Sequence, residues 1–157
     1  AGCARCPPQE DRAHPGELVG VMFCDLDGFK AINDSFGHQV GDDVLCAATS
    51  LISGGVRPGD VVARLGGDEF VVVLDAVKGR DGGQHVAQKL VSVLDGGYWV
   101  NDLVRVPTVS VGLCLAEGTW KAEDLLSAAD EALYEAKRAG GGQFSVRELS
   151  APDDGGL

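Results

Sequence analysis

The chain has 157 residues, of which 45% are hydrophobic and 24% are charged, and its formal net charge is −11. This composition predicts one soluble domain with a sizeable core, and the acidic balance disfavours nonspecific binding to nucleic acids or anionic membranes. Because no apolar run is long enough to cross a bilayer and no signal-peptide pattern is present, we expect a cytoplasmic protein without direct membrane insertion.

The first segment, residues 1–17, is rich in proline, glycine and charge and has no periodicity. This predicts a disordered segment or the remnant of a linker. Cys3 and Cys6 form one Cys-x-x-Cys pair with no second pair behind it, so a loose segment is favoured over a zinc or redox site. The odd total of five cysteines argues against a disulfide framework. The other three lie within apolar runs and are predicted to be buried: Cys24, Cys46 and Cys114.

A nearly continuous apolar run from Leu18 to Cys24 predicts a central strand buried on both faces. It ends in Asp25-Leu26-Asp27, and strand alternation directs the two carboxylates the same way, with Leu26 opposite. Ligands of open α/β sheets gather beyond the carboxyl ends of strands, so the acids are candidates for a binding site. The alternative is a pair of turn-forming acids that only ends the strand.

The apolar spacing from Val40 to Ile52 predicts a helix, which two glycines end. We assign no regular element to residues 28–39. A β-hairpin is predicted next, in which the strand Val61 to Leu65 returns as Phe70 to Val77.

The bend of this hairpin is Gly66-Gly67-Asp68-Glu69. Glycine takes a positive φ without steric cost and suits a tight turn. Two adjacent carboxylates on a rigid turn repel each other unless a cation lies between them, so they are a candidate site for Mg²⁺. The alternative is a solvated acidic turn.

The remaining elements complete the layout. We expect a loop at 78–83, a helix at 84–94, a short hairpin at 98–105, a strand at 106–115, a helix at 121–139 and a strand at 143–149. Helices that follow strands beside a largely antiparallel sheet are typical of an α+β, ferredoxin-like fold. We place the domain at residues 18–149 and a flexible tail at 150–157.

Three stretches together resemble one family. They are Gly66-Gly67-Asp68-Glu69-Phe70, the segment from Phe23 to His38 with Gly41-Asp42, and the segment from Ala129 to Lys137. They are similar to the GGDEF family, the diguanylate cyclases, which condense two GTP into cyclic di-GMP and two pyrophosphates. The resemblance implies the palm-like GGDEF fold over nearly all of the predicted domain.

The resemblance also implies a set of site residues. A divalent cation, Mg²⁺ or Mn²⁺, is expected at Asp25, the Leu26 carbonyl, Asp68 and Glu69, and which of the last two acts as the base stays open. Substrate-binding roles are implied for Asn33 and Asp42 at guanine and for a second group near the triphosphate: Gly28, Phe29, Lys30, Gly67 and Lys137. Each has a structural alternative, since Lys137 suits a helix C-terminus and Asn33 and Asp42 suit turns and caps.

Arg57 and Asp60 stand just before the hairpin, in Arg57-Pro58-Gly59-Asp60. In the family this placement implies an inhibitory site that binds the product cyclic di-GMP, and an Arg fork with a carboxylate suits guanine and phosphate. Without the spacing, the same four residues would be an ordinary turn.

Two departures from the family pattern favour a second hypothesis. Residues 1–17 lack the usual opening segment, and Gly140-Gly141-Gly142 replaces a glycine followed by a basic residue. A lost charge-assisted phosphate contact costs about 1.5–3 kcal/mol of triphosphate binding. The alternatives are therefore a degenerate domain that binds cyclic di-GMP or GTP without turnover, and a structural interaction module. The first hypothesis implies a homodimer, fusion to a sensory domain and no nucleic-acid partner.

Overall fold

A five-stranded sheet with the strand order β2-β3-β1-β6-β7 forms the centre of the molecule. The structure is a computed structural model and describes residues 17–151. All neighbouring strands are antiparallel except β6 and β7, which are parallel. This confirms the α+β prediction. The strands are β1 (Glu17–Leu26), β2 (Val61–Gly66), β3 (Glu69–Lys78), β6 (Val109–Ala116) and β7 (Phe144–Leu149).

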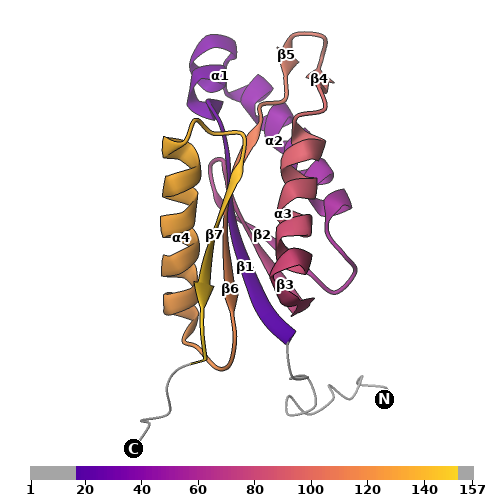
Figure 1. Ribbon diagram of the computed structural model, residues 1–157. Helices are drawn as coiled ribbons and strands as arrows, with labels where there is room; N and C mark the ends of the chain where they lie inside the picture. The colour runs from indigo at the N-terminus through magenta and orange to yellow at the C-terminus, as the bar shows by residue number, and fades with distance from the viewer. Residues whose placement is uncertain (1–16, 152–157) are drawn as a thin grey trace, which may run out of the picture.

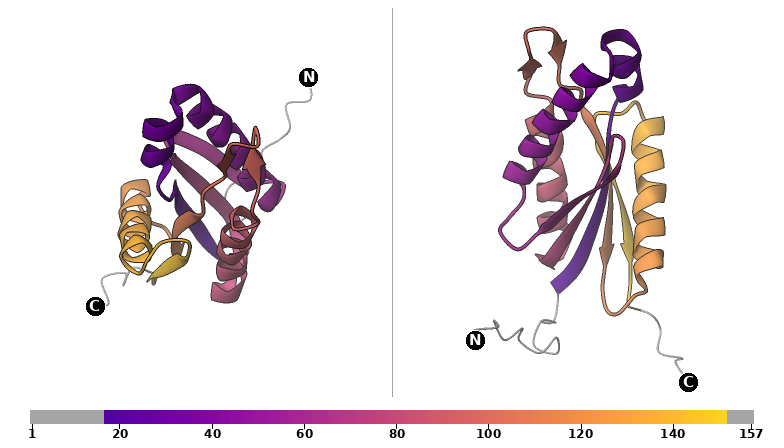
Figure 2. Two further views of the ribbon diagram at one scale, coloured as in Figure 1. Left: turned by 90° about the horizontal axis from the view of Figure 1, so that it is seen from above. Right: turned by 180° about the vertical axis from the view of Figure 1, so that it is seen from behind.

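Four helices flank the sheet, and a separate small hairpin lies at one end. The helices α2 and α3 cover one face and α4 covers the other (Figures 1 and 2). The helix α1 and the hairpin β4–β5 lie at the end of the molecule where β1 finishes, the upper end in Figure 1. These elements are α1 (Phe29–Phe36), α2 (His38–Gly55), α3 (Gly79–Leu94), α4 (Ala122–Arg138), β4 (Trp99–Val100) and β5 (Val104–Arg105).

The core has two parts because the sheet is covered on both faces. The larger cluster lies under α2 and α3 and includes Met22, Ile52 and Phe70, each fully buried. The smaller cluster lies under α4 and includes Val21 and Cys114. Burying one such large apolar side chain contributes about 1.5–3 kcal/mol. Alternation along β1 therefore supplies both clusters, and it leaves Asp25 on the α4 side.

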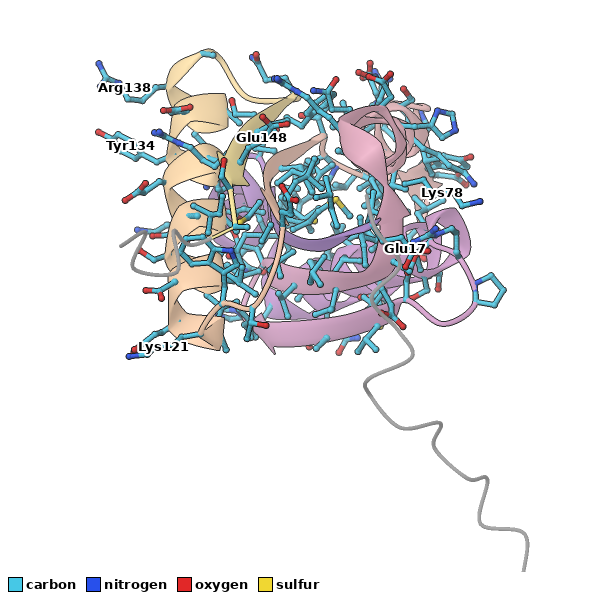
Figure 3. The ribbon with its side chains drawn as sticks, turned by 60° about the horizontal axis from the view of Figure 1, so that its bottom comes forward. Glu17, Lys78, Lys121, Tyr134, Arg138 and Glu148 are labelled. Atoms are coloured by element: carbon cyan, nitrogen blue, oxygen red, sulfur yellow. The ribbon has the colours of Figure 1, made fainter. Side chains whose placement is uncertain are left out.

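The helix α4 packs closely on β6 because Gly112 has no side chain. A Cβ at Gly112 would lie 2.1 Å from the carbonyl oxygen of Ala129 and 2.2 Å from the backbone nitrogen of Leu133. The opposite face of α4 is solvated, and Figure 3 shows Lys121, Tyr134 and Arg138 projecting outward from it. The close contact fixes the middle of α4, around Ala129 and Leu133, over the sheet.

Two segments predicted to be irregular are helical. Residues 29–36 form α1, which two glycines with positive φ delimit, Gly28 at 70° and Gly37 at 90°; eight residues are too few for a clear periodic signal. Most of the loop expected at 78–83 is the first turn and a half of α3. Its glycines obscured the apolar pattern, although Gly83 is needed there because a Cβ would lie 2.6 Å from a methyl group of Leu115.

Some smaller expectations also differ. Cys46 is exposed, in contrast to the buried Cys24 and Cys114, because it lies on the outer side of α2. Burial raises the pKa of the Cys24 thiol to about 12, and the charge of Asp25 adds to this effect. The predictions for Cys3, Cys6 and the tail beyond residue 151 fall outside the described range. Among residues 17–151, no helix is long and apolar enough to cross a membrane.

Candidate active site

The end of β1 and the bend of the β2–β3 hairpin lie against each other. The hairpin turns on Gly67-Asp68, and the N–H of Leu26 donates to the carbonyl oxygen of Asp68 at 3.3 Å. On the adjacent strand, Asp25 is the direct register partner of Glu69. Asp25 therefore converges at one end of the sheet with Asp68 and Glu69, which lie 43 and 44 positions later in the sequence.

Asp25 is the most strongly perturbed carboxylate of the group. It is only 6% exposed. One oxygen accepts a hydrogen bond from the ammonium of Lys137, and the other is buried without a partner among the described residues. The pKa of Asp25 is raised to about 6; burial is the main cause, Lys137 opposes the rise, and Asp68 adds to it. The site therefore has more negative than positive side chains, because Lys137 is one cation beside three carboxylates.

Lys137 reaches this acid from the last turn of α4. Burial alone would lower its pKa, but the hydrogen bond to Asp25 and the charges of Asp25, Asp68 and Asp27 outweigh that effect and raise it. The ammonium is therefore firmly protonated. A cation at this place can pair with a carboxylate or with the phosphates of a bound ligand.

The acids can hold a divalent cation only together with donors from elsewhere. Within residues 17–151, no three His, Cys, Asp or Glu side chains form a ready-made metal cage. Mg²⁺ commonly takes one or two carboxylates and completes its shell with water and substrate phosphates. The unpartnered oxygen of Asp25 and the nearby Asp68 fit that requirement.

The N-terminus of α1 follows the two acids of β1 directly. Gly28 is its N-cap, with φ 70°, and no side chain caps the first turn. Phe29 is buried and anchors the helix, whereas Lys30 is exposed. Free N–H groups at a helix N-terminus attract anions. The segment predicted to hold the triphosphate thus has suitable donors beside the acids.

Asn33 lies against Gly41, the neighbour of Asp42, at the packing contact between α1 and α2. A Cβ on Gly41 would lie 1.7 Å from Oδ1 of Asn33, so this side chain occupies the space that glycine leaves. Asp42 follows Gly41 directly and is exposed, while Asn33 is half-buried. The contact brings the two predicted guanine-binding residues to one place.

Arg57 and Asp60 lie away from these groups, at the start of β2. The guanidinium and carboxylate of the two residues form two hydrogen bonds of 3.2 Å, and the backbone N–H of Arg57 donates to the same carboxylate at 3.0 Å. Arg57 also donates to the Asp75 carbonyl oxygen at 3.1 Å. The six residues of β2 separate this pair from the bend by about 20 Å.

A surface hollow of about 820 Å³ opens beside the acids. Asp25, Glu69 and Lys137 line one part of it, and it continues over the outer face of α4 past Tyr134 to Arg147. The part beside the acids is accessible from solvent, so a ligand can reach them. The whole hollow is larger than the part that the acids and Lys137 line.

Asp27, which the sequence analysis placed with Asp25 as a candidate binding acid, instead has a set of hydrogen bonds within the protein. Its carboxylate accepts hydrogen bonds from the hydroxyl of Thr108 at 2.8 Å, the hydroxyl of Ser110 at 2.6 Å and the N–H of Gly142 at 2.8 Å. These partners are 81, 83 and 115 positions away, so no local motif marks them. Strand alternation, which places Asp27 beside Asp25, was the available signal.

Comparison with known proteins identifies what this arrangement is similar to. The family model described as "Diguanylate cyclase, GGDEF domain" matches residues 8–143. MucR of Pseudomonas aeruginosa, a bifunctional diguanylate cyclase/cyclic di-GMP phosphodiesterase, is 39% identical over 83% of the chain and 19% of MucR.

Two solved structures extend the comparison. The GGDEF domain of TpbB (YfiN) from P. aeruginosa has a TM-score of 0.78 and 37% identity and covers 85% of this chain and 78% of that one. The GGDEF domain of DgcB from Caulobacter crescentus, solved in complex with c-di-GMP, has a TM-score of 0.69 and 26% identity and covers 88% and 80%. The chain spans about a third or less of the first curated relatives' length.

Proposed function

The chain belongs to the GGDEF family of diguanylate cyclases, and we propose that it condenses two GTP molecules into cyclic di-GMP with release of two pyrophosphates. The observation that carries the proposal is Asp25, a buried carboxylate with one unpartnered oxygen, a raised pKa and two further acids on the neighbouring bend. Such a group is suited to a cation and to phosphoryl chemistry.

The proposed reaction is an in-line attack of a ribose 3′-hydroxyl on the α-phosphorus of a second GTP. Asp25, Asp68, Glu69 and the Leu26 carbonyl would hold Mg²⁺ or Mn²⁺. When bound, the cation would neutralise phosphate charge and lower the pKa of the attacking hydroxyl. Asp68 or Glu69 would orient the hydroxyl and accept its proton. Lys137 pairs with the negative phosphates.

The remaining residues would hold the substrate. Backbone N–H groups around Gly28 and Phe29, with Lys30 and Gly67 nearby, would bind phosphate oxygens. Asp42 would accept hydrogen bonds from guanine N1–H and the exocyclic amine, and the Asn33 amide would contact another edge of the base.

Two copies of the chain are required by this proposal. Each chain presents one set of site residues, and the product contains two nucleotides, so catalysis calls for a homodimer with the two sites facing each other. We also propose a cytoplasmic location and fusion to a sensory domain.

Arg57 and Asp60 are proposed to bind the product as an inhibitory site. The Arg57 side chain is half-exposed, and the buried Asp60 carboxylate already orients its guanidinium. Bound cyclic di-GMP would take hydrogen bonds from the outer N–H groups of Arg57. The alternative of a receptor without turnover is not favoured, since the acids of the site are intact.

The test is formation of cyclic di-GMP from GTP and Mg²⁺, with the chain fused to a dimeric coiled coil. We expect cyclic product together with pyrophosphate, one pyrophosphate for each phosphodiester bond that forms. Asp68→Ala should lower turnover by at least about 100-fold while the melting temperature stays within a few degrees. Exposed Asp34→Ala is the matched control and should retain activity. A folded wild-type dimer that makes no product contradicts the proposal.

A further inference from the structure

The carboxylate of Asp27 is the centre of a hydrogen-bonded clasp, which consists of Asp27, Thr108, Ser110 and Gly142. Both carboxylate oxygens are used: one accepts from Thr108 and Gly142, and the other accepts from the fully buried Ser110. The N–H of Asp27 also donates to the Thr108 carbonyl oxygen at 2.8 Å. A carboxylate satisfied in this way differs from Asp25, whose second oxygen has no partner among the described residues.

The clasp holds the turn that follows α4. In this turn the N–H of Gly140 donates to the Lys137 carbonyl oxygen at 3.1 Å, and the N–H of Gly141 donates to the Ala136 carbonyl oxygen at 3.0 Å. The turn is therefore one unit with the last residues of the helix. Gly141 has φ 74°, and a Cβ there would lie 3.1 Å from a carboxylate oxygen of Asp27. Glycine thus permits the close approach.

From this geometry we propose that Asp27 is a positioning residue, which fixes the C-terminal end of α4 so that the Lys137 ammonium lies beside Asp25. The inference rests on the proposed function, in which Lys137 contacts the triphosphate. Asp25 and Asp27 are two positions apart at the end of β1. Lys137 donates to Asp25 and Gly142 donates to Asp27, so one short segment contacts both acids. Any displacement of this turn moves the ammonium relative to the carboxylates of the site.

The direction in which nucleotide affinity changes distinguishes a positioning role of Asp27 from a purely electrostatic one. Removing a negative charge close to a triphosphate strengthens nucleotide binding if only electrostatics acts. If Asp27 acts by holding Lys137 in place, the same substitution weakens binding. Asp27→Ala removes both acceptor oxygens, so none of the three bonds of the clasp can form. Asp27→Asn is unsuitable because the Ser110 hydroxyl can accept a hydrogen bond from the amide.

The experiment measures the affinity of guanosine 5′-(β,γ-imido)triphosphate with Mg²⁺. We expect Asp27→Ala to bind about tenfold more weakly than wild type, the effect of one misplaced charge-assisted contact. On a Lys137→Gln background the same substitution should have little further effect, because coupled residues are not additive. The control is Asp124→Ala, an equal charge change in the first turn of the same helix, and it should bind like wild type.

A second arm needs no nucleotide. Amide hydrogen exchange at Gly141 and Gly142 should be at least about tenfold faster in Asp27→Ala, while amides in the middle of α4 keep their protection. Unchanged exchange at Gly142, tighter nucleotide binding, or an equal loss on both backgrounds would each overturn the positioning role. A wild-type chain that binds no nucleotide defeats the proposed function instead, and the exchange result then decides whether Asp27 holds the turn.

Discussion

At the scale of single residues, Asp25 shows a conflict between stability and site chemistry. Burial and the neighbouring Asp68 raise its pKa from 3.8 to about 6. Between these two values the folded chain holds more protons at this group than the unfolded chain does. The free energy of unfolding therefore falls as the pH rises from about 4 to 6, and this loss persists above pH 6.

We accordingly expect Asp25→Asn to be more stable than wild type at pH 7.5 without divalent cations, by about 2 kcal/mol. Lys137 is half-exposed and can turn to solvent when its partner is lost. The advantage should shrink as the pH falls and should vanish at about pH 3, below both pKa values, where the wild-type carboxyl is protonated in both states. Urea unfolding of both chains at the two pH values measures the difference. A variant that is less stable than wild type at pH 7.5 would show that the ion pair dominates.

At the scale of elements, the junction of α1 and α2 couples backbone packing to base recognition. Gly41→Ala would place a Cβ 1.7 Å from Oδ1 and 2.9 Å from Cγ of Asn33, so the amide must leave its position. Alanine is favoured over glycine in a helix by about 1 kcal/mol, which offsets part of the steric cost. We therefore expect a modest change in stability and a larger loss of discrimination between GTP and ATP.

Calorimetry with both nucleotides measures that ratio. Gly54→Ala is the matched control, because it lies in the same helix and a Cβ there meets nothing within 4 Å. The control should keep the ratio and gain stability. An unchanged ratio in Gly41→Ala would mean that Asn33 does not contact guanine.

The elements also show what the sequence could predict. The strands β1, β3 and β7 and the helix α4 were predicted to within about two residues at most ends, because each has a long and regular apolar pattern. The helix α1 is short and bounded by glycines, and the start of α3 is rich in glycine, so periodicity failed there. The resemblance to the GGDEF family implied that Asp25 shares a site with Asp68 and Glu69, whereas the clasp of Asp27 depends on tertiary contacts that no local pattern encodes.

At the scale of the whole molecule, the distribution of sites along the sheet separates two proposed activities. The acids, α1 and the α1–α2 junction share the end of the molecule where β1 finishes, and Arg57 with Asp60 lies about a strand length away. A ligand at the second place cannot touch the reacting groups of the same chain. Inhibition there would have to act through the arrangement of two chains or through the β2–β3 hairpin.

The two-chain proposal makes a prediction about the product itself. Cyclic di-GMP contains two phosphodiester bonds, and if each chain's acids form one of them, a mixed dimer with one Asp68→Ala chain can form only one. Wild-type chain mixed with a large excess of the variant should release one pyrophosphate and accumulate the linear dinucleotide instead of the cyclic product. Chromatography with mass detection distinguishes the two, and excess Asp34→Ala chain is the control. Continued cyclic product in proportion to the wild-type chain, with no linear species, would mean that one chain forms both bonds.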